Sequence, residues 1–380
     1  MKTNVKKFWK ILVPVVGVGV VSCSVVFLSG CLVKTPLVSL GGSTAVLPLI
    51  NALSPYINFI DVVTSAGGSG VGINSIINGT KEIGMASTKP DILNLGANNN
   101  KYQVWDEKKV KTVTIAWDGI ALIYKPSSIS INTDLIINEE NLAKIYYTFS
   151  GKKQFKLGEL LNNNDETIIT PYARNGGSSV SGTTDAFFKD SHLNYKDTNY
   201  WQNLTENVKN SINDAIVNGS YGTNVIQTAE SNSQAWNVAK NGPEGSLVYL
   251  SAGFVINNID EIRKYGFKVA LYNDKRISPE PVSPLNPEAI AKTYNWYRPL
   301  NLIYSMIYIK NIPEIPRMIA WILFNEQAKN IIKNEGYVPL EYENLKSMGW
   351  KGDLNDMSFL TNDSSDDGTY DIKLQYSGAK

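Results

Sequence analysis

The chain has 380 residues, of which 43% are apolar, and its 36 Lys and Arg nearly balance its 35 Asp and Glu for a formal charge of +1. These values allow roughly two or three domains, exclude collagen-like, disulfide-scaffold and disordered proteins, and leave no charge excess for a nucleic-acid partner. The single histidine, His192, argues against a histidine-based metal site and against a Ser-His-Asp hydrolase, so we expect neither an enzyme nor a cofactor nor a bound metal.

The N-terminus has the layout of an export signal. Four lysines precede an apolar run from Ile11 to Leu28, and small residues lead to a cysteine. The sequence Leu28-Ser29-Gly30-Cys31 resembles a bacterial lipobox, in which the cysteine is lipidated and the peptide before it is removed. We therefore expect a signal peptide over residues 1–30, a lipid on Cys31 and a tether over residues 31–36.

Two alternatives to this lipid anchor stay open. Cys23 follows Val21 and Ser22 and is a competing lipidation site. The apolar run is also close to the roughly 20 residues that a membrane span needs. In each case we expect the rest of the chain on the outer face of the cytoplasmic membrane, extracellular or periplasmic.

Beyond the tether, apolar runs alternate with helical stretches, which indicates an α/β fold. The first part of the chain predicts, in order, a strand at Val38–Leu40, a helix at Thr44–Leu53, a strand at Val62–Thr64, a helix at Gly70–Ile77 that ends at Gly79, and a strand at Ile83–Ala86. Two apolar strands follow, at Val113–Ala116 and Ile120–Tyr124. We expect a break between them at Trp117-Asp118-Gly119.

The second part begins with a polar, helix-rich region over residues 127–218. It continues with expected strands at Leu247–Tyr249 and Phe254–Ile256, a proline-rich connector over residues 278–284, a strand at Leu302–Ile309 and a helix at Pro316–Lys333. Serine and aspartate dominate residues 361–371, which we expect to form a loop.

Three clusters of glycine, serine and threonine follow predicted strands where helices begin. They are Gly41-Gly42-Ser43-Thr44, Gly67-Gly68-Ser69-Gly70 and the segment Arg174–Thr183. Helix starts expose unpaired N–H groups and a partial positive charge, so several of them together form an anion site from neutral parts. Each cluster alone is more typical of a helix cap or a loop, and only the three together favour an anion site. None has the spacing of a nucleophile elbow or a P-loop, which argues against hydrolases and nucleotide binding.

These clusters and further segments together resemble the phosphate-binding proteins (PstS) of the high-affinity phosphate ABC importer. The matching segments are Gly41-Gly42-Ser43-Thr44, Ala66–Ile73, Ile83–Ser87, Asp118–Ala121, Arg174–Thr183, Pro243–Tyr249, Arg298–Leu300 and Glu335–Leu340. The similarity covers about residues 37–345, and its specificity lies in the combination, because each segment alone is weak.

The resemblance implies a bilobed periplasmic-binding-protein fold, in which two α/β lobes joined by two hinge crossings close on a dehydrated oxyanion. The hinges would fall near Val113–Trp117 and Val269–Asn273. One lobe would then contain residues 37–115 and 272–380, and the other residues 116–271.

The resemblance also implies a phosphate site made of hydroxyls, amides and one arginine. Hydroxyls and amides would donate to the phosphate oxygens, and Arg174 would supply a charge-assisted pair. The residues that correspond by position are Thr44, the amide of Ala45, Ser69, Ser87 or Thr88, Arg174, Ser181, Gly182 and Thr183.

Two departures from the family pattern affect this site. The chain has Ala86-Ser87-Thr88 where family members have Ala-Ser-Asp, so it lacks the carboxylate that would accept the proton of hydrogen phosphate. Selectivity against sulfate, which carries no such proton, is therefore open, with Thr88, Asp118 and Asp185 as candidate acceptors. The loop after Arg174 is also longer than usual, so Arg174 can sit differently and Ser178 or Ser179 can take part.

Our leading hypothesis is a lipid-anchored, monomeric receptor that captures inorganic phosphate for the permease and ATPase subunits of an ABC importer. The alternatives are a receptor for sulfate, molybdate or tungstate, favoured by Thr88, and a surface adhesin on the same scaffold that uses asparagine-rich loops. Removal of residues 1–30 would leave 32 basic and 35 acidic side chains. An anion must then be bound by local dipoles, because the overall charge repels it.

Overall fold

One long strand, β4 (Val110–Tyr124), joins the two largest hydrophobic cores of the described residues. The computed structural model describes residues 35–88, 110–287, 289–290, 292–309, 311–347, 350–353 and 360. The predicted signal peptide, both cysteines and the predicted loop over residues 361–371 lie outside these residues. No helix within the described ranges combines the length and the apolar character that a membrane span requires.

The N-terminal part builds a layer of parallel strands and helices. In chain order its elements are β1 (Leu37–Gly42), α1 (Leu47–Leu53), the 3-10 turn η1 (Ser54–Tyr56), β2 (Asp61–Ala66), α2 (Ser69–Asn78) and β3 (Ile83–Ala86). Strand β1 lies between β2 and β3 and pairs in parallel with both. Gly79 ends α2 at a φ of 69°, as the sequence predicts, because glycine has no Cβ to clash in this conformation.

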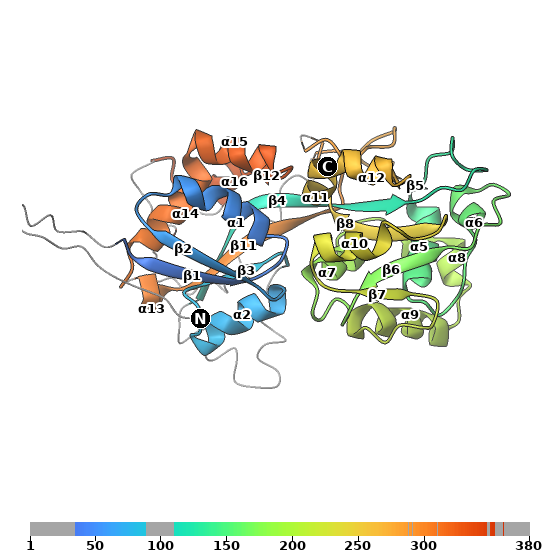
Figure 1. The fold of residues 1–380 in the computed structure, drawn as a ribbon, viewed down its shortest axis with the longest axis horizontal. Coiled ribbons are helices and arrows are strands. Elements are labelled where there is room, and N and C mark those ends of the chain that lie inside the picture. The colour runs from blue at the N-terminus through green and yellow to red at the C-terminus, as the bar shows by residue number, and fades with distance from the viewer. Residues whose placement is uncertain are drawn as a thin grey trace, which may run out of the picture. The chain divides into compact units, whose positions relative to one another are not determined.

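Strand β4 (Val110–Tyr124) connects the two halves of the sheet. Its residues 110–119 pair antiparallel with β11 (Tyr297–Ser305), and its residues 120–124 pair antiparallel with β8 (Ser246–Ser251). Figure 1 shows β4 running from the β1, β2 and β3 group to the β6, β7 and β8 group. The predicted break in this strand is wrong, because Asp118 stays in register and pairs with Arg298 of β11.

The middle of the chain folds helices around a short sheet. Its elements are β5 (Ile136–Ile137), α5 (Glu139–Phe149), α6 (Leu157–Leu161), β6 (Thr170–Arg174), α7 (Gly182–Lys189), η2 (Tyr195–Asp197), α8 (Asn199–Gln202), α9 (Glu206–Asn218), β7 (Ile226–Thr228), α10 (Asn232–Ala239), β8, α11 (Ala252–Asn257), α12 (Ile259–Lys264), β9 (Lys268–Val269) and β10 (Leu271–Tyr272). Strand β6 pairs in parallel with β7 and β8. The strand predicted at 254–256 is wrong: these residues belong to α11, whose first turn the Ser251 hydroxyl caps.

The C-terminal part returns through β11 to the first half of the sheet. It continues with α13 (Met306–Ile309), α14 (Glu314–Phe324), α15 (Glu326–Asn334), β12 (Val338–Pro339) and α16 (Tyr342–Ser347). The strand predicted at Leu302–Ile309 corresponds to β11, which starts earlier, at Tyr297, and ends at Ser305. Residues Met306–Ile309 form α13 instead. The single helix predicted at Pro316–Lys333 is two helices, because Asn325 has extended backbone and its side chain accepts hydrogen bonds from the first amides of α15.

Each half of the sheet has its own hydrophobic core. The sheet order is β2-β1-β3-β11-β4-β8-β6-β7, and β4 contributes to both cores. The first core includes Leu40, Leu49, Val113, Leu302 and Ile319. The second includes Ile123, Trp236, Tyr249, Ile290, Tyr294 and Trp296. We call the part built on the first core lobe 1 and the part built on the second core lobe 2.

Candidate functional site

Three buried serines of lobe 1 meet where strands give way to helices or loops. Ser43 follows β1, Ser69 opens α2 and Ser87 follows β3. The Ser87 hydroxyl lies 3.0 Å from the Ser43 hydroxyl and 3.3 Å from the Ser69 hydroxyl, and the Ser87 amide donates to Ser69 Oγ over 3.0 Å. The carboxyl ends of neighbouring parallel strands share one edge of a sheet, which brings these residues together. We call Ser43, Ser69 and Ser87 the serine cluster.

The start of α7, from lobe 2, lies against the serine cluster. A Cβ on Gly182 would overlap the Ser69 hydroxyl and lie 2.5 Å from the Ser87 hydroxyl, so only glycine permits this approach. Gly68, before α2, has a φ of +87°, and a Cβ there would lie 3.1 Å from the carbonyl oxygen of Val180. The first turns of α2 and α7, with their unpaired N–H groups and partial positive charge, therefore meet across the two lobes.

Arg298 of β11 links the serine cluster to α7. Its Nη1 donates to Thr183 Oγ1 over 2.9 Å and to Ser87 Oγ over 3.3 Å. Its Nε and Nη2 donate to Asp118 Oδ2 over 3.0 and 2.8 Å. Both charged groups are completely buried. Asp118 neutralises the charge of Arg298. The pair can therefore interact with an anion through its oriented dipoles but not through a net charge.

Arg174, at the end of β6, is a second fully buried arginine. Its Nη2 donates to Asn232 Oδ1 over 2.9 Å and its Nη1 to Thr228 Oγ1 over 3.4 Å. Among the described residues, its Nε has no hydrogen-bond partner and no carboxylate forms an ion pair with it. Burial lowers the pKa of Arg174. The fold thus holds a cation where its charge is penalised, and a bound anion would relieve that penalty.

Glu230 lies close to the meeting point of α2 and α7. Its Cγ is 3.8 Å from the position that a Cβ on Gly68 would take. Its Oε2 is buried without a hydrogen-bond partner in the described part of the chain. Burial raises the pKa of Glu230, and the charge of Arg174 and the Ser181 hydrogen bond oppose that rise. Ser181 also caps α7, since its Oγ accepts from the Thr184 amide over 3.1 Å.

Thr88 has a partner of its own outside the serine cluster. Its Oγ1 donates to Asp185 Oδ2 over 2.6 Å, and its carbonyl oxygen accepts from Asn301. The other carboxylate oxygen of Asp185 pairs with Lys189 over 2.5 Å. Thr88 and Asp185 therefore satisfy each other across the two lobes.

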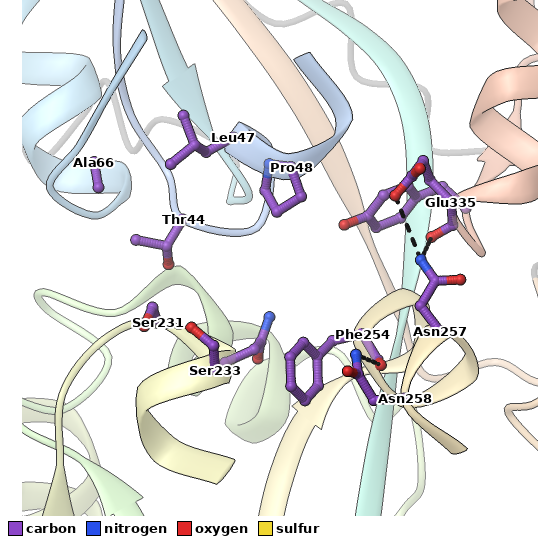
Figure 2. Close-up of a pocket in the computed structure, with 12 residues that line it drawn as sticks. Thr44, Leu47, Pro48, Ala66, Ser231, Ser233, Phe254, Asn257, Asn258 and Glu335 are labelled. Carbon is purple, nitrogen blue, oxygen red and sulfur yellow. Dashed lines mark hydrogen bonds between the residues drawn. The ribbon is translucent and has the colours of Figure 1, made fainter. Parts of the chain in front are cut away.

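A cavity of about 350 Å³ opens between the lobes beside these helix starts. Figure 2 shows Thr44, Leu47 and Pro48 on one side of it and Ser231, Ser233 and Phe254 on the other. Thr44 faces this cavity, whereas the Ala45 amide donates to the Ser43 hydroxyl over 3.2 Å. The residues that line the cavity do not include the serine cluster, and Thr44 is the lining residue that follows Ser43 in the chain.

The residues predicted for binding divide into two groups in the structure. Ser69, Ser87, Gly182 and Thr183 come together around Arg298. The others have separate surroundings: the amide of Ala45 bonds to Ser43, Thr44 lines the cavity, Thr88 bonds to Asp185, Ser181 caps α7, and Arg174 bonds to Asn232. Within the described ranges, no group of three or more His, Cys, Asp or Glu side chains has the arrangement of a metal site.

Sequence reasoning missed three residues of this arrangement. Arg298 had a usable signal, because a lone charge inside an apolar, aromatic segment must be paired when it is buried. Ser43 belongs to the first glycine-serine-threonine cluster, but the resemblance pointed to its neighbour Thr44. Glu230 had no signal, since its position depends on how the loop after β7 packs against α2 and α7.

The comparison with known sequences finds a relative along nearly the whole chain. The uncharacterized lipoprotein MG412 of Mycoplasma genitalium is 32% identical over 368 residues, which cover 90% of each of the two proteins. No family model matches the sequence.

Solved structures show the same fold. A candidate phosphate ABC transporter substrate-binding protein from Clostridium perfringens, solved with bound phosphate, matches with a TM-score of 0.54 and 21% identity, over 80% of this chain and 100% of that one. A phosphate-binding protein from Stenotrophomonas maltophilia matches with a TM-score of 0.55 and 13% identity, over 80% of this chain and 91% of that one. The predicted bilobed, periplasmic-binding-protein-like α/β fold is confirmed.

Proposed function

The chain belongs to the family of the Mycoplasma genitalium lipoprotein MG412, and we propose that it is a lipid-anchored receptor that captures inorganic phosphate for an ABC import permease. In this proposal it performs no chemistry on its ligand. The observation that carries the proposal is the meeting of the serine cluster, Thr183 and the start of α7 beside two buried arginines.

A weakly negative protein holds a dianion through local hydrogen bonds rather than through its overall charge. Hydrogen bonds to a charged group contribute about 1.5–3 kcal/mol each, so several hydroxyl and amide donors hold a phosphate without a net positive surface. Arg298 is already neutralised by Asp118. Arg174 has no ion pair among the described residues and a free Nε, and it is the cation that an incoming phosphate would pair with.

The proposed phosphate contacts come from both lobes. They are the hydroxyls of Ser43, Ser69, Ser87 and Thr183, the amide of Gly182 and the guanidinium of Arg174. Ser181 serves as the cap that orients α7, and Thr88 acts through its bond to Asp185. Thr44 and the amide of Ala45 lie at the approach to the site, where they contact phosphate as it enters.

We further propose that the lobes close on phosphate by bending of β4 and β11, the strands that link them. Residues 37–115 would belong to lobe 1 and residues 116–271 to lobe 2, as the resemblance implies. The chain would pass from lobe 2 back to lobe 1 at the start of β11 rather than at residue 272, because Ile290, Tyr294 and Trp296 pack in the second core.

The lipid anchor rests on the N-terminal sequence and on the relative. The lipobox-like residues before Cys31 predict that residues 1–30 are removed and that Cys31 is acylated, with residues 31–36 as the tether. MG412 is itself named a lipoprotein, which supports an anchored, extracellular or periplasmic position. Buried methylenes of two or three acyl chains, at about 0.8 kcal/mol each, are sufficient to hold a domain on a bilayer.

A second candidate function is a receptor for another tetrahedral oxyanion, namely sulfate, molybdate or tungstate. It is favoured by the residue at position 88, where Thr88 carries a neutral hydroxyl that donates to Asp185 and the family pattern has a carboxylate that would accept the ligand proton. Equal affinity of the protein for phosphate and sulfate at the same ionic strength would favour this alternative.

Transport is tested by phosphate uptake in cells that lack the chain. Cells complemented with the wild type are expected to recover uptake of labelled phosphate, and cells that carry Arg174→Ala are expected to stay at the deleted level. Surface adhesion of both strains, measured in parallel, should be equal. Recovered uptake with Arg174→Ala would remove Arg174 from the site. No recovery of uptake with the wild type, with adhesion restored, would contradict the transport role and favour an adhesin.

Replacing Gly182 with alanine is expected to weaken phosphate binding by at least about tenfold. The added Cβ would collide with the Ser69 and Ser87 hydroxyls and hold α7 away from the serine cluster. Calorimetric titration measures the effect. Gly70→Ala is the matched control, since its Cβ would meet nothing closer than the Ser179 carbonyl oxygen at 3.9 Å. Equal loss in both variants would argue against the proposed site.

A further inference from the structure

The cavity between the lobes lies beside the proposed phosphate contacts and is not formed by them. Its volume of about 350 Å³ falls within the roughly 300–1,000 Å³ that is typical of small-molecule sites. The serine cluster, Gly182, Thr183 and Arg174 are all outside its lining. A phosphate held by those groups therefore does not occupy the cavity, and a larger ligand has a second place to bind.

The cavity adjoins the phosphate contacts on both lobes. Thr44 lines it from lobe 1 and directly follows Ser43 of the serine cluster. Asn232 lines it from lobe 2, and its Oδ1 accepts from Nη2 of Arg174 over 2.9 Å. An oxygen of a bound phosphate that points toward Thr44 and Asn232 can thus carry an ester group into the cavity.

The lining has the chemistry of a site for a hydroxyl-bearing group. Leu47, Pro48 and Phe254 offer apolar surface to carbon atoms of a ligand. Most other lining side chains are neutral hydroxyls and amides, namely Thr44, Ser231, Asn232, Ser233, Asn257 and Asn258. Because hydroxyls and amides both donate and accept, they match the hydroxyls of a polyol, while the apolar surface matches its carbon chain.

The end of the cavity opposite Thr44 accepts hydrogen bonds and disfavours a second negative charge. Figure 2 shows Asn257 and Glu335 at this end. The Asn257 Nδ2 donates to the Glu335 carbonyl oxygen over 3.2 Å and to its Oε2 over 3.4 Å. The Asn258 Nδ2 donates to the Phe254 carbonyl oxygen over 2.8 Å. With these nitrogens engaged, the amide oxygens can accept from ligand hydroxyls, and the carboxylate repels a second phosphate group.

We propose that the cavity binds the organic group of a small polyol phosphate, whose phosphate occupies the site proposed for inorganic phosphate. This inference rests on the proposed function and widens its substrate class to singly phosphorylated polyols. In this arrangement the serine cluster and Arg174 hold the phosphate, whereas Phe254 and the asparagines of the cavity recognise the organic group. Glu335 excludes polyols that carry a phosphate at each end.

Calorimetric titration of the purified full-length protein in detergent tests this proposal, with inorganic phosphate, glycerol 3-phosphate and glycerol as probes. The wild type is expected to bind glycerol 3-phosphate within about tenfold of its affinity for inorganic phosphate, because the ester carbon enters the cavity instead of colliding with the protein. The two anions should compete for the same site. Glycerol alone should show no measurable binding, since it lacks the phosphate anchor.

Ser233→Phe is the variant that fills the cavity. Ser233 is exposed in the first turn of α10, and Figure 2 shows it at the cavity wall. The ring is expected to lower the affinity for glycerol 3-phosphate by at least about tenfold and to leave that for inorganic phosphate unchanged. The matched control is Asn237→Phe, which adds the same ring at an exposed position of the same helix outside the lining, and it should leave both affinities unchanged.

The outcomes separate this inference from the proposed function. Binding of inorganic phosphate without binding of glycerol 3-phosphate by the wild type would overturn the polyol phosphate proposal and leave the phosphate receptor intact. Unchanged glycerol 3-phosphate affinity in Ser233→Phe, or an equal loss in Asn237→Phe, would overturn the role of the cavity. Binding of glycerol 3-phosphate alone would overturn inorganic phosphate as the ligand and support the cavity, and binding of neither anion would overturn both proposals.

Discussion

Replacing Arg298 with methionine is expected to destabilise the protein by about 3–5 kcal/mol. The change leaves Asp118 as a completely buried carboxylate that has lost the guanidinium on its Oδ2. It also removes the donor to Ser87 and Thr183, so the serine cluster loses its link to α7. This cost is a large part of the 5–15 kcal/mol that typically holds a domain folded. Urea unfolding followed by far-UV circular dichroism measures it.

The control for this prediction removes both charges. Arg298→Met combined with Asp118→Leu should recover most of the lost stability, because a buried ion pair replaced by apolar groups of similar volume is often close to neutral. The double variant should still bind phosphate poorly, since Thr183 and Ser87 remain without their shared donor. A loss below about 1 kcal/mol in the single variant would mean that the pair does not have the buried geometry described above.

Replacing Arg174 with methionine is expected to separate binding from folding. Phosphate affinity should fall about 100-fold, which is the loss of one charge-assisted pair of about 2.7 kcal/mol. The free energy of unfolding should change by less than about 1 kcal/mol, because Arg174 has no ion pair among the described residues and Asn232 keeps its bond from the Ser251 amide. Calorimetry measures the first quantity and urea unfolding the second.

Arg174→Lys is the matched variant for this experiment. Lysine keeps the charge but loses the planar fork, so we expect affinity between that of the wild type and that of Arg174→Met. Full phosphate binding by Arg174→Met would show that the buried cation has no part in the site. A large loss of stability would instead assign Arg174 a structural role through Thr228 and Asn232.

The strands of the first lobe were predictable because their apolar runs are short and bounded by glycine and serine. Val38–Leu40, Val62–Thr64 and Ile83–Ala86 all lie within observed strands. Errors arose where tertiary contacts override local pattern. Asp118 looks like a strand break, but its partner is Arg298, distant in sequence and invisible to any local rule. Phe254–Ile256 is apolar enough for a strand, yet the Ser251 cap starts a helix there.

The candidate site was predictable as far as helix starts determine it. Ser69, Gly182 and Thr183 lie in the first turns of α2 and α7, where glycine and hydroxyl residues have a recognisable pattern. The environments of Arg174 and Thr88 were not predictable, because Asn232 and Asp185 come from other elements.

The central claim is that a phosphate site forms between the two lobes, and titration of the purified full-length protein with inorganic phosphate tests it most directly. We expect saturable binding of one phosphate per chain, weakened about 100-fold in Arg174→Met and unchanged in Gly70→Ala. No detectable phosphate binding by the wild type, under conditions where its circular dichroism shows a folded protein, would contradict it.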